Sequence, residues 1–288
     1  MDLIELTRTT GQKLLFEGKH DQAVPAALQS LKFAIDVFGL ASINLVPSYL
    51  ILGEASIGLG RLEQAEEYLM QANWTVLKTP ECSNAIKSKL YRNLGLLYAA
   101  KGDYDEALRQ LADDIYHSAQ EFGTDDIRTA GGYYHMANIF FRKNEMAVAD
   151  SLYTRVIDIW HKHLSGIIKV RTKTPLVARG PGPVFDDEIE EEDKLEAEAV
   201  QVLNAVLDIR EHTPSDSWEL VKILHALAML QFLFKNLAAG NEYCQKALEV
   251  SSEEESEELE AENKYKNMLE LVYCKKLQYK NEYLKRHC

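Results

Sequence analysis

The sequence has few of the features that mark secreted, membrane or zinc-binding proteins. Its 288 residues include only four cysteines, at positions 82, 244, 274 and 288, and no two of them lie close together as zinc ligands do. We therefore expect reduced thiols in an intracellular protein. No apolar run approaches the roughly 20 residues that cross a bilayer. The opening residues lack the basic and apolar segments of a signal peptide, so we expect none.

Acidic residues are in excess, but they are concentrated in two short runs. The formal net charge is −13, while residues 186–193 hold seven acidic side chains and residues 253–258 hold five. Little excess charge remains elsewhere and no basic surface is indicated, so we expect no nucleic-acid partner. Neither run has the alternation or the glycine of a calcium-binding loop, so we interpret both as solvated charge.

Catalytic motifs are missing as well. The sequence has no glycine-rich phosphate loop, and no cysteine stands in a recognisable signature with histidine and asparagine. His161 and His163 are separated by one residue, which places them on different faces of a helix and argues against a shared metal. We expect no catalytic residue, no cofactor and no metal site.

What the sequence does contain is a pair of small residues that recurs at a constant interval. In residues 93–112, NLGLLYAAKGDYDEALRQLA, Gly95 precedes Ala107 by twelve residues, with a glycine turn between them. The same arrangement recurs three times, with Gly11 and Ala23, Gly53 and Ala65, and Ala137 and Ala149. The second member recurs every 42 residues, and apolar residues at helical spacing flank each pair. This pattern predicts two helices per unit in a helical solenoid.

The turns follow the same register. We expect the first helix of each unit to end in left-handed backbone at Gly18, Gly60 and Gly102, with Asn144 in that place in the fourth unit. Asp103 and Asp21 are predicted N-caps of the second helices.

This spacing of small and large residues around a turn resembles the tetratricopeptide repeat, most clearly in YRNLGLLYAAKGDYDEALRQLA. The usual tetratricopeptide unit has 34 residues, and the longer unit of 42 residues resembles the form found in kinesin light chains and related adaptors. The resemblance implies an all-α, right-handed superhelical solenoid of helical hairpins.

The expected organisation has four parts. Residues 1–163 form four hairpins, residues 164–193 form an inserted and mobile loop, basic and then acidic, residues 194–253 form further tetratricopeptide-like helices, and residues 254–288 form a long capping helix.

In such arrays the first helix of each hairpin lines the concave side, where a partner binds. Polar residues expected to point there are Arg8, Gln12, Glu54, Lys89, Arg92, Asn93, Tyr134, His135, Asn138, Arg142, Lys222 and His225. Most suggestive is the cluster on two neighbouring units, Lys89, Arg92 and Asn93 with Tyr134, His135 and Asn138. In the adaptors that the repeat resembles, an asparagine there holds a bound peptide's backbone. Two alternatives stay open: these are solvated polar faces, or residues 164–185 or the tail fold back into the groove.

Two longer segments carry a further resemblance. TRTTGQKLLFEGKHDQAVPAALQSLKFAIDVFG and YHMANIFFRKNEMAVADSLYTRVIDIWHKHL are similar to the repeat region of a zinc finger MYND domain-containing family. That family carries a Cys/His zinc finger, which this sequence lacks, so we expect no zinc-dependent role. The resemblance implies a cytoplasmic protein of the axoneme, in cilia or sperm flagella, with a second tetratricopeptide protein and dynein components as partners.

The leading hypothesis is therefore a non-catalytic scaffold that docks protein partners in a motile-cilium assembly. The alternative is an adaptor that binds short linear peptides in its concave groove, as kinesin light chains do.

Overall fold

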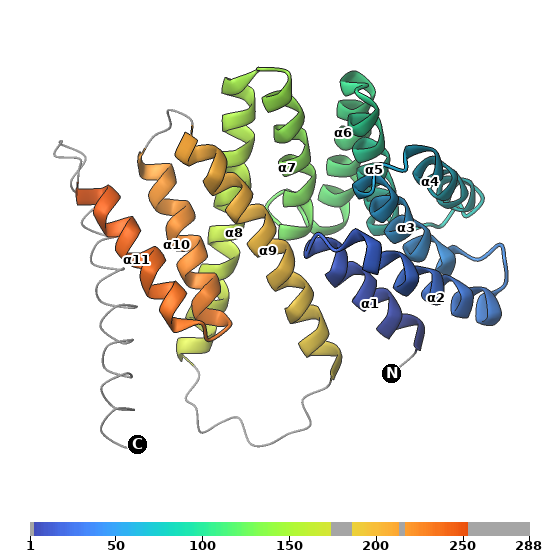
Figure 1. Ribbon diagram of the computed structural model, residues 1–288, viewed down its shortest axis with the longest axis horizontal. Helices are drawn as coiled ribbons and strands as arrows, with labels where there is room; N and C mark the ends of the chain where they lie inside the picture. The colour runs from blue at the N-terminus through green and yellow to red at the C-terminus, as the bar shows by residue number, and fades with distance from the viewer. Residues whose placement is uncertain (1–2, 174–185, 213–216, 253–288) are drawn as a thin grey trace. The chain divides into compact units, whose positions relative to one another are not determined.

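The computed structural model describes residues 3–173, 186–212 and 217–252. Over these residues the chain forms eleven α-helices and one short 3₁₀ helix, and no strand (Figure 1). The helices are α1 (Leu3–Phe16), α2 (His20–Phe38), the 3₁₀ helix η1 (Ile43–Leu45), α3 (Val46–Gly58), α4 (Leu62–Leu77), α5 (Asn84–Lys101), α6 (Tyr104–Phe122), α7 (Ile127–Arg142), α8 (Met146–Lys173), α9 (Asp186–His212), α10 (Ser217–Leu233) and α11 (Leu237–Ser252). The predicted all-α class of tetratricopeptide-like hairpins is confirmed.

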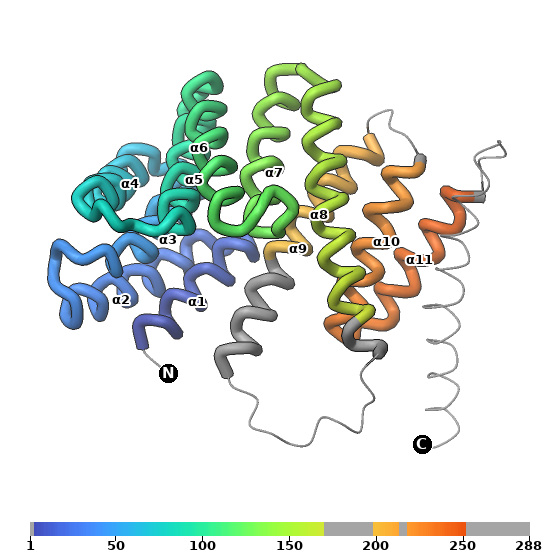
Figure 2. Tube along the Cα trace, turned by 180° about the vertical axis from the view of Figure 1, so that it is seen from behind, coloured from blue at the N-terminus to red at the C-terminus, as the bar shows by residue number. Residues whose placement is uncertain are grey.

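The chain divides into two compact units. Unit 1 comprises Met1–Ile159 and Arg179–Gln201, and unit 2 comprises Trp160–Ala178 and Val202–Cys288. In unit 1 the hairpins α1/α2, α3/α4 and α5/α6 follow one another in chain order, and α3 contacts both α1 and α5 (Figure 2). In unit 2, α10 and α11 pack as a further hairpin.

Small residues let the two helices of each hairpin approach closely. A Cβ atom added to Gly95 would lie 2.7 Å from Cγ of Leu111 and 3.3 Å from the carbonyl oxygen of Ala107. Ala107 and Leu111 are both fully buried, so neither has free space into which it could move. The α10/α11 hairpin is less tightly packed at the corresponding glycine, because a Cβ on Gly240 would lie 3.5 Å from the carbonyl oxygen of Ala228, an ordinary van der Waals distance. A side chain would therefore fit at Gly240, whereas Gly95 leaves no room for one.

The turns inside the hairpins keep one backbone geometry. Positive φ angles occur at Gly18 (71°), Gly60 (72°), Gly102 (83°) and Asn144 (61°), as the 42-residue register predicts. At the third turn the amide of Gly102 donates to the carbonyl of Ala99, and the amide of Asp103 to that of Tyr98. These bonds satisfy carbonyls that the helix end would leave unpaired. Lys235, between α10 and α11, takes the same conformation (63°), which the sequence did not indicate.

The two predicted N-caps have different outcomes. Asp103 is the N-cap of α6, and its Oδ1 accepts a hydrogen bond of 3.2 Å from the amide of Glu106. Asp21 is not an N-cap, because α2 begins at His20 and Asp21 lies in its first turn. The 42-residue register explains the error, since it aligns Lys19 and not Asp21 with Asp103. In the first turn, the carboxylate of Asp21 still interacts favourably with the positive end of the helix dipole.

The structure differs from the expected loop at 164–193. Helix α8 continues to Lys173. Trp160, Leu164 and Ile168 are all buried, and because they are four residues apart they form one continuous apolar face along this part of the helix. The acidic run belongs to α9, which begins at Asp186. Residues 174–185 and the predicted capping helix at 254–288 lie outside the described residues.

The close approach at Gly95 predicts opposite effects of the same substitution at two helical glycines. Gly95→Ala should lower stability by about 1–3 kcal/mol because the new methyl group overpacks a buried contact. Gly166→Ala, in α8, should raise stability by about 0.5–1 kcal/mol, since nothing lies within 4 Å of the added Cβ and alanine favours the helix. Urea unfolding followed by circular dichroism measures both. Equal effects at the two positions would contradict the close-packing account.

Candidate protein-interaction surface

The predicted cluster on α5 and α7 centres on a buried ion pair. Nε of Arg92 donates to Oδ2 of Asp114 at 2.8 Å, and Nη2 donates to the carbonyl oxygen of Arg128 at 2.8 Å. Asp114 comes from α6 and is fully buried, while the Arg92 side chain is 18% exposed. Arg92 therefore links α5, α6 and the start of α7. Its positively charged group makes the contacts that hold these three helices together.

The surrounding residues are shaped to hold the pair. The Oγ of Ser88 donates to Oδ1 of Asp114 at 2.5 Å. A Cβ on Gly131 would lie 2.6 Å from Nη1 of Arg92, and one on Gly132 would lie 2.8 Å from Oδ2 of Asp114. The adjacent glycines, which weaken a helix, thus leave room for the two charged groups. Sequence reasoning missed Asp114, although two consecutive glycines inside a predicted helix were a signal of close contact.

Electrostatics at this junction keep Arg92 charged and His135 neutral. Burial lowers the pKa of Arg92, but the charge and the hydrogen bonds of Asp114 outweigh it, and the pKa is raised above its ordinary value. Glu198 of α9 and Glu54 of α3 act in the same direction. Burial, and then the charge of Arg92, lower the pKa of His135 to about 3. The residues that surround Arg92 thus compensate its charge within unit 1.

The two predicted asparagines also make contacts inside the chain. Nδ2 of Asn93 donates to the carbonyl oxygen of Lys89 at 3.0 Å, and Asn93 is only 5% exposed. Its Oδ1 is buried without a hydrogen-bond partner among the described residues. Oδ1 of Asn138 accepts a hydrogen bond of 2.6 Å from the hydroxyl of Tyr153, whose ring lies 6.5 Å from that of Tyr134.

The remaining predicted residues of unit 1 lie nearer to solvent. Lys89 and Arg142 are exposed, while Arg8, Gln12 and Glu54 are half-buried. Arg8 pairs with Glu5 on its own helix. The structure therefore leaves exposed cationic groups on α5 and α7, beside a largely buried polar network.

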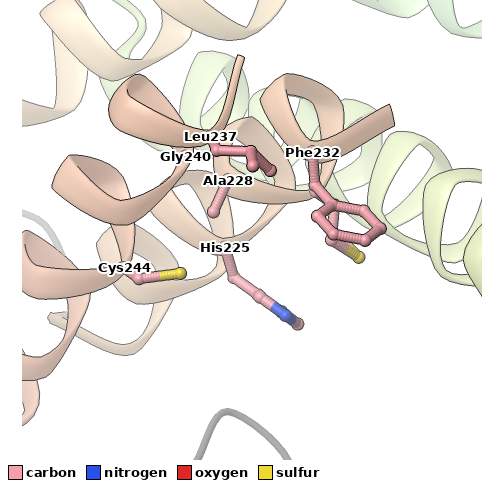
Figure 3. Close-up of a pocket in the computed structure, with 7 residues that line it drawn as sticks. His225, Ala228, Phe232, Leu237, Gly240 and Cys244 are labelled. Carbon is pink, nitrogen blue, oxygen red and sulfur yellow. The ribbon is translucent and has the colours of Figure 1, made fainter. Parts of the chain in front are cut away.

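In unit 2 the expected surface position of His225 is wrong. His225 is 3% exposed, and its Nδ1 lies 2.9 Å from Nε2 of His161 in a hydrogen bond. It lines a small apolar pocket together with residues of α10 and α11, including Cys244 (Figure 3). That pocket has about 10 Å³ of space, too little for a ligand. His225 is buried because α10 is enclosed on nearly all sides, and every residue from 223 to 230 is buried. Lys222, on the same helix, is half-buried, with its Nζ 5.9 Å from the centre of the Trp218 ring.

Two other kinds of site are absent from the part of the chain that the structure describes. No group of three or more histidine, cysteine, aspartate or glutamate side chains is placed to hold a metal ion there. No helix in that part has both the length and the apolar character to cross a membrane.

Removing one partner of the buried ion pair should lower the stability of the folded protein. Asp114→Ala is expected to destabilise the protein by about 3–5 kcal/mol, because it leaves the Arg92 guanidinium largely buried and without its carboxylate. The double substitution Arg92→Leu with Asp114→Leu should cost less than Asp114→Ala alone, since no unpaired charge remains. Urea unfolding of the three proteins tests this. As a control, Arg109→Ala removes an exposed pair with Glu106 and should change stability by less than about 1 kcal/mol.

Acid should weaken unit 2 through His225. Burial, and then the charge of His161, lower the pKa of His225 from 6.5 to about 4. Between these values the unfolded chain binds a proton that the folded chain does not, so stability falls as the pH drops from about 6.5 to about 4. His225→Gln should remove on the order of 3 kcal/mol of this pH dependence. The measurement is urea unfolding at several pH values; His212→Gln, at an exposed helix end, should leave the dependence in place.

Comparisons with known proteins find a tetratricopeptide repeat in the chain. A family model described as tetratricopeptide repeat matches residues 46–73, which span α3 and most of α4. A solved structure described as the crystal structure of BtubC (BKLC) from P. vanneervenii is similar over 83% of this chain and 97% of that one, with 14% sequence identity and a TM-score of 0.41. The tetratricopeptide fold is typically non-catalytic, and its repeats generally mediate protein–protein interactions. The chain thus contains a tetratricopeptide repeat, set among further helical hairpins.

Proposed function

We propose that this protein is a non-catalytic scaffold that binds protein partners on the face formed by α1, α3, α5 and α7, here called the first-helix face. The observation that carries the proposal is the hairpin repeated in a 42-residue register, one copy of which matches the tetratricopeptide model. First helices of such repeats line the surface on which partners bind.

The residues best suited to contact a partner there are the exposed cations on α5 and α7. Lys89 and Arg142 are exposed, while Arg92 and Asn138 are half-buried and hydrogen-bonded within the repeat. Exposed charge at a rim steers association and selects partners more than it adds affinity. An acidic segment of a folded partner would complement Lys89 and Arg142.

The setting that we propose is the axoneme of a cilium or sperm flagellum. Its support is the similarity of two segments of the sequence to the repeat region of zinc finger MYND domain-containing protein 12. A second tetratricopeptide protein and dynein components are the proposed partners, and the cytoplasm is where the protein would meet them.

One observation favours the alternative function, an adaptor for short linear peptides. The Oδ1 of Asn93 is buried on α5 without a hydrogen-bond partner among the described residues, and a peptide amide could supply one. The two functions differ in the partner, because an adaptor holds an isolated extended peptide and a scaffold buries a large surface of a folded protein.

Affinity capture from a ciliated-tissue extract, followed by mass spectrometry, tests the proposal. Lys89→Glu with Arg142→Glu should leave helical circular dichroism unchanged and reduce capture of axonemal proteins. Arg109→Glu is the matched control, since it reverses an exposed charge on a second helix, where the side chain is 70% exposed. Equal capture by both variants would place the binding surface elsewhere. If short peptides taken from the captured proteins bind the chain in isolation, the result would favour the adaptor function.

A further inference from the structure

Helix α4 carries a stripe of exposed apolar residues. Met70, Trp74 and Leu77 are 58%, 59% and 70% exposed, and their spacing of four and three residues aligns them along the helix. The opposite side of α4 carries a second line with the same kind of spacing, formed by the buried residues Ala65, Leu69, Ala72 and Val76. Helix α4 is therefore apolar on two sides, and the described part of unit 1 covers only one of them.

The repeat itself does not require this stripe. The positions equivalent to Met70, Trp74 and Leu77, 42 residues away in each direction, hold Leu28, Lys32 and Ile35 in α2 and Ala112, Tyr116 and Ala119 in α6. Only α4, of these three second helices, has large apolar side chains exposed at all three positions. In α2 the middle position is a lysine, and in α6 alanine occupies the first and the last. The stripe is thus a property of this hairpin and not of the fold.

The two ends of the stripe carry opposite charges. Glu63 and Glu67 continue the same line toward the start of α4, and with Glu66 they line an open hollow of about 640 Å³. Glu66 is bonded to Nζ of Lys101 at 2.8 Å. At the other end of the helix, Nζ of Lys78 lies 4.3 Å from the centre of the Trp74 ring. The surface is therefore acidic at its start, apolar in its middle and basic at its end.

We propose that the stripe binds one amphipathic α-helix of a partner protein. Side chains that repeat at alternating three- and four-residue spacing mesh with a second helix of the same spacing, whereas an extended strand has a period of two. The line from Glu63 to Leu77 is about 20 Å long, enough for four turns of a partner helix. The partner helix carries apolar residues against Met70, Trp74 and Leu77, and lysine or arginine at the end that faces the glutamates. This surface lies on a second helix and does not depend on the proposed first-helix face.

Peptides of defined pattern test the proposal on the full chain. The first has leucine at alternating three- and four-residue spacing with lysine at the polar positions; the second has glutamate in place of lysine; the third has the composition of the first in shuffled order, without a stripe. Fluorescence anisotropy at physiological salt measures their binding. We expect the first to bind at least about tenfold more tightly than either other peptide.

Variants assign that binding to α4. Trp74→Ser should weaken binding of the first peptide at least about tenfold, as loss of an aromatic anchor does. Tyr116→Ser, at the equivalent position of α6 and 59% exposed, should have no effect. Glu63→Gln with Glu67→Gln should weaken binding and reduce its salt dependence, while Glu190→Gln with Glu191→Gln in the acidic run should not.

Several outcomes would overturn the proposal. Equal binding of the shuffled peptide would show attraction by charge alone, and unchanged binding by Trp74→Ser would place the site elsewhere. A third such outcome would come from the molar mass measured by light scattering. If the chain is a dimer that Trp74→Ser converts to a monomer, the stripe binds a second copy of this chain. Lys89→Glu with Arg142→Glu should leave peptide binding unchanged, so that failure here and failure of the proposed first-helix face are distinguished.

Discussion

The close approach of paired helices is the constraint on which the other features of this protein depend. A hairpin of two short helices buries little apolar surface alone, and it becomes stable when its backbones come near enough for large side chains to interlock around them. Gly95 against Ala107 shows how little room remains. The turn must then bring the second helix back at a fixed angle, and the left-handed residue at Gly18, Gly60, Gly102 or Asn144 does this in each copy.

The third hairpin meets this constraint in a different chemical way. At positions 30, 72 and 156 the second helices bury Ser30, Ala72 and Val156, but at the equivalent position 114 the chain has an aspartate. A buried carboxylate requires a cation and further hydrogen-bond donors, which α5 supplies through Arg92 and Ser88. Such a pair adds little net stability compared with apolar packing, yet either half alone is unfavourable, so Arg92 and Asp114 depend on each other.

This internal use of polar residues changes where a partner can bind. Arg92, His135 and Asn138 stand at positions that a repeat array offers to its ligands, but here all three are half-buried, and Arg92 and Asn138 are hydrogen-bonded within the chain. The side of unit 1 that would ordinarily be solvated and polar carries, on α4, three exposed apolar residues in line. A row of large exposed apolar side chains gains nothing for the stability of unit 1, and this is the observation from which we propose that α4 binds a partner.

The repeat can be identified from the amino-acid sequence without any structure. Helical periodicity, the 42-residue interval between small residues and the glycine turns depend on local backbone geometry and on contacts inside one hairpin, so a linear pattern contains them. For the same reason Asn144 could be identified as a substitute for a turn glycine. The tertiary structure alone decided which polar residues are solvated: Arg92 is neutralised by Asp114, 22 residues away, and His225 is hydrogen-bonded to His161, 64 residues away. It also decided that α8 continues past residue 164, where Leu164 and Ile168 are buried. A helical pattern shows which residues share a face, but whether that face meets water or another helix depends on segments distant in the chain.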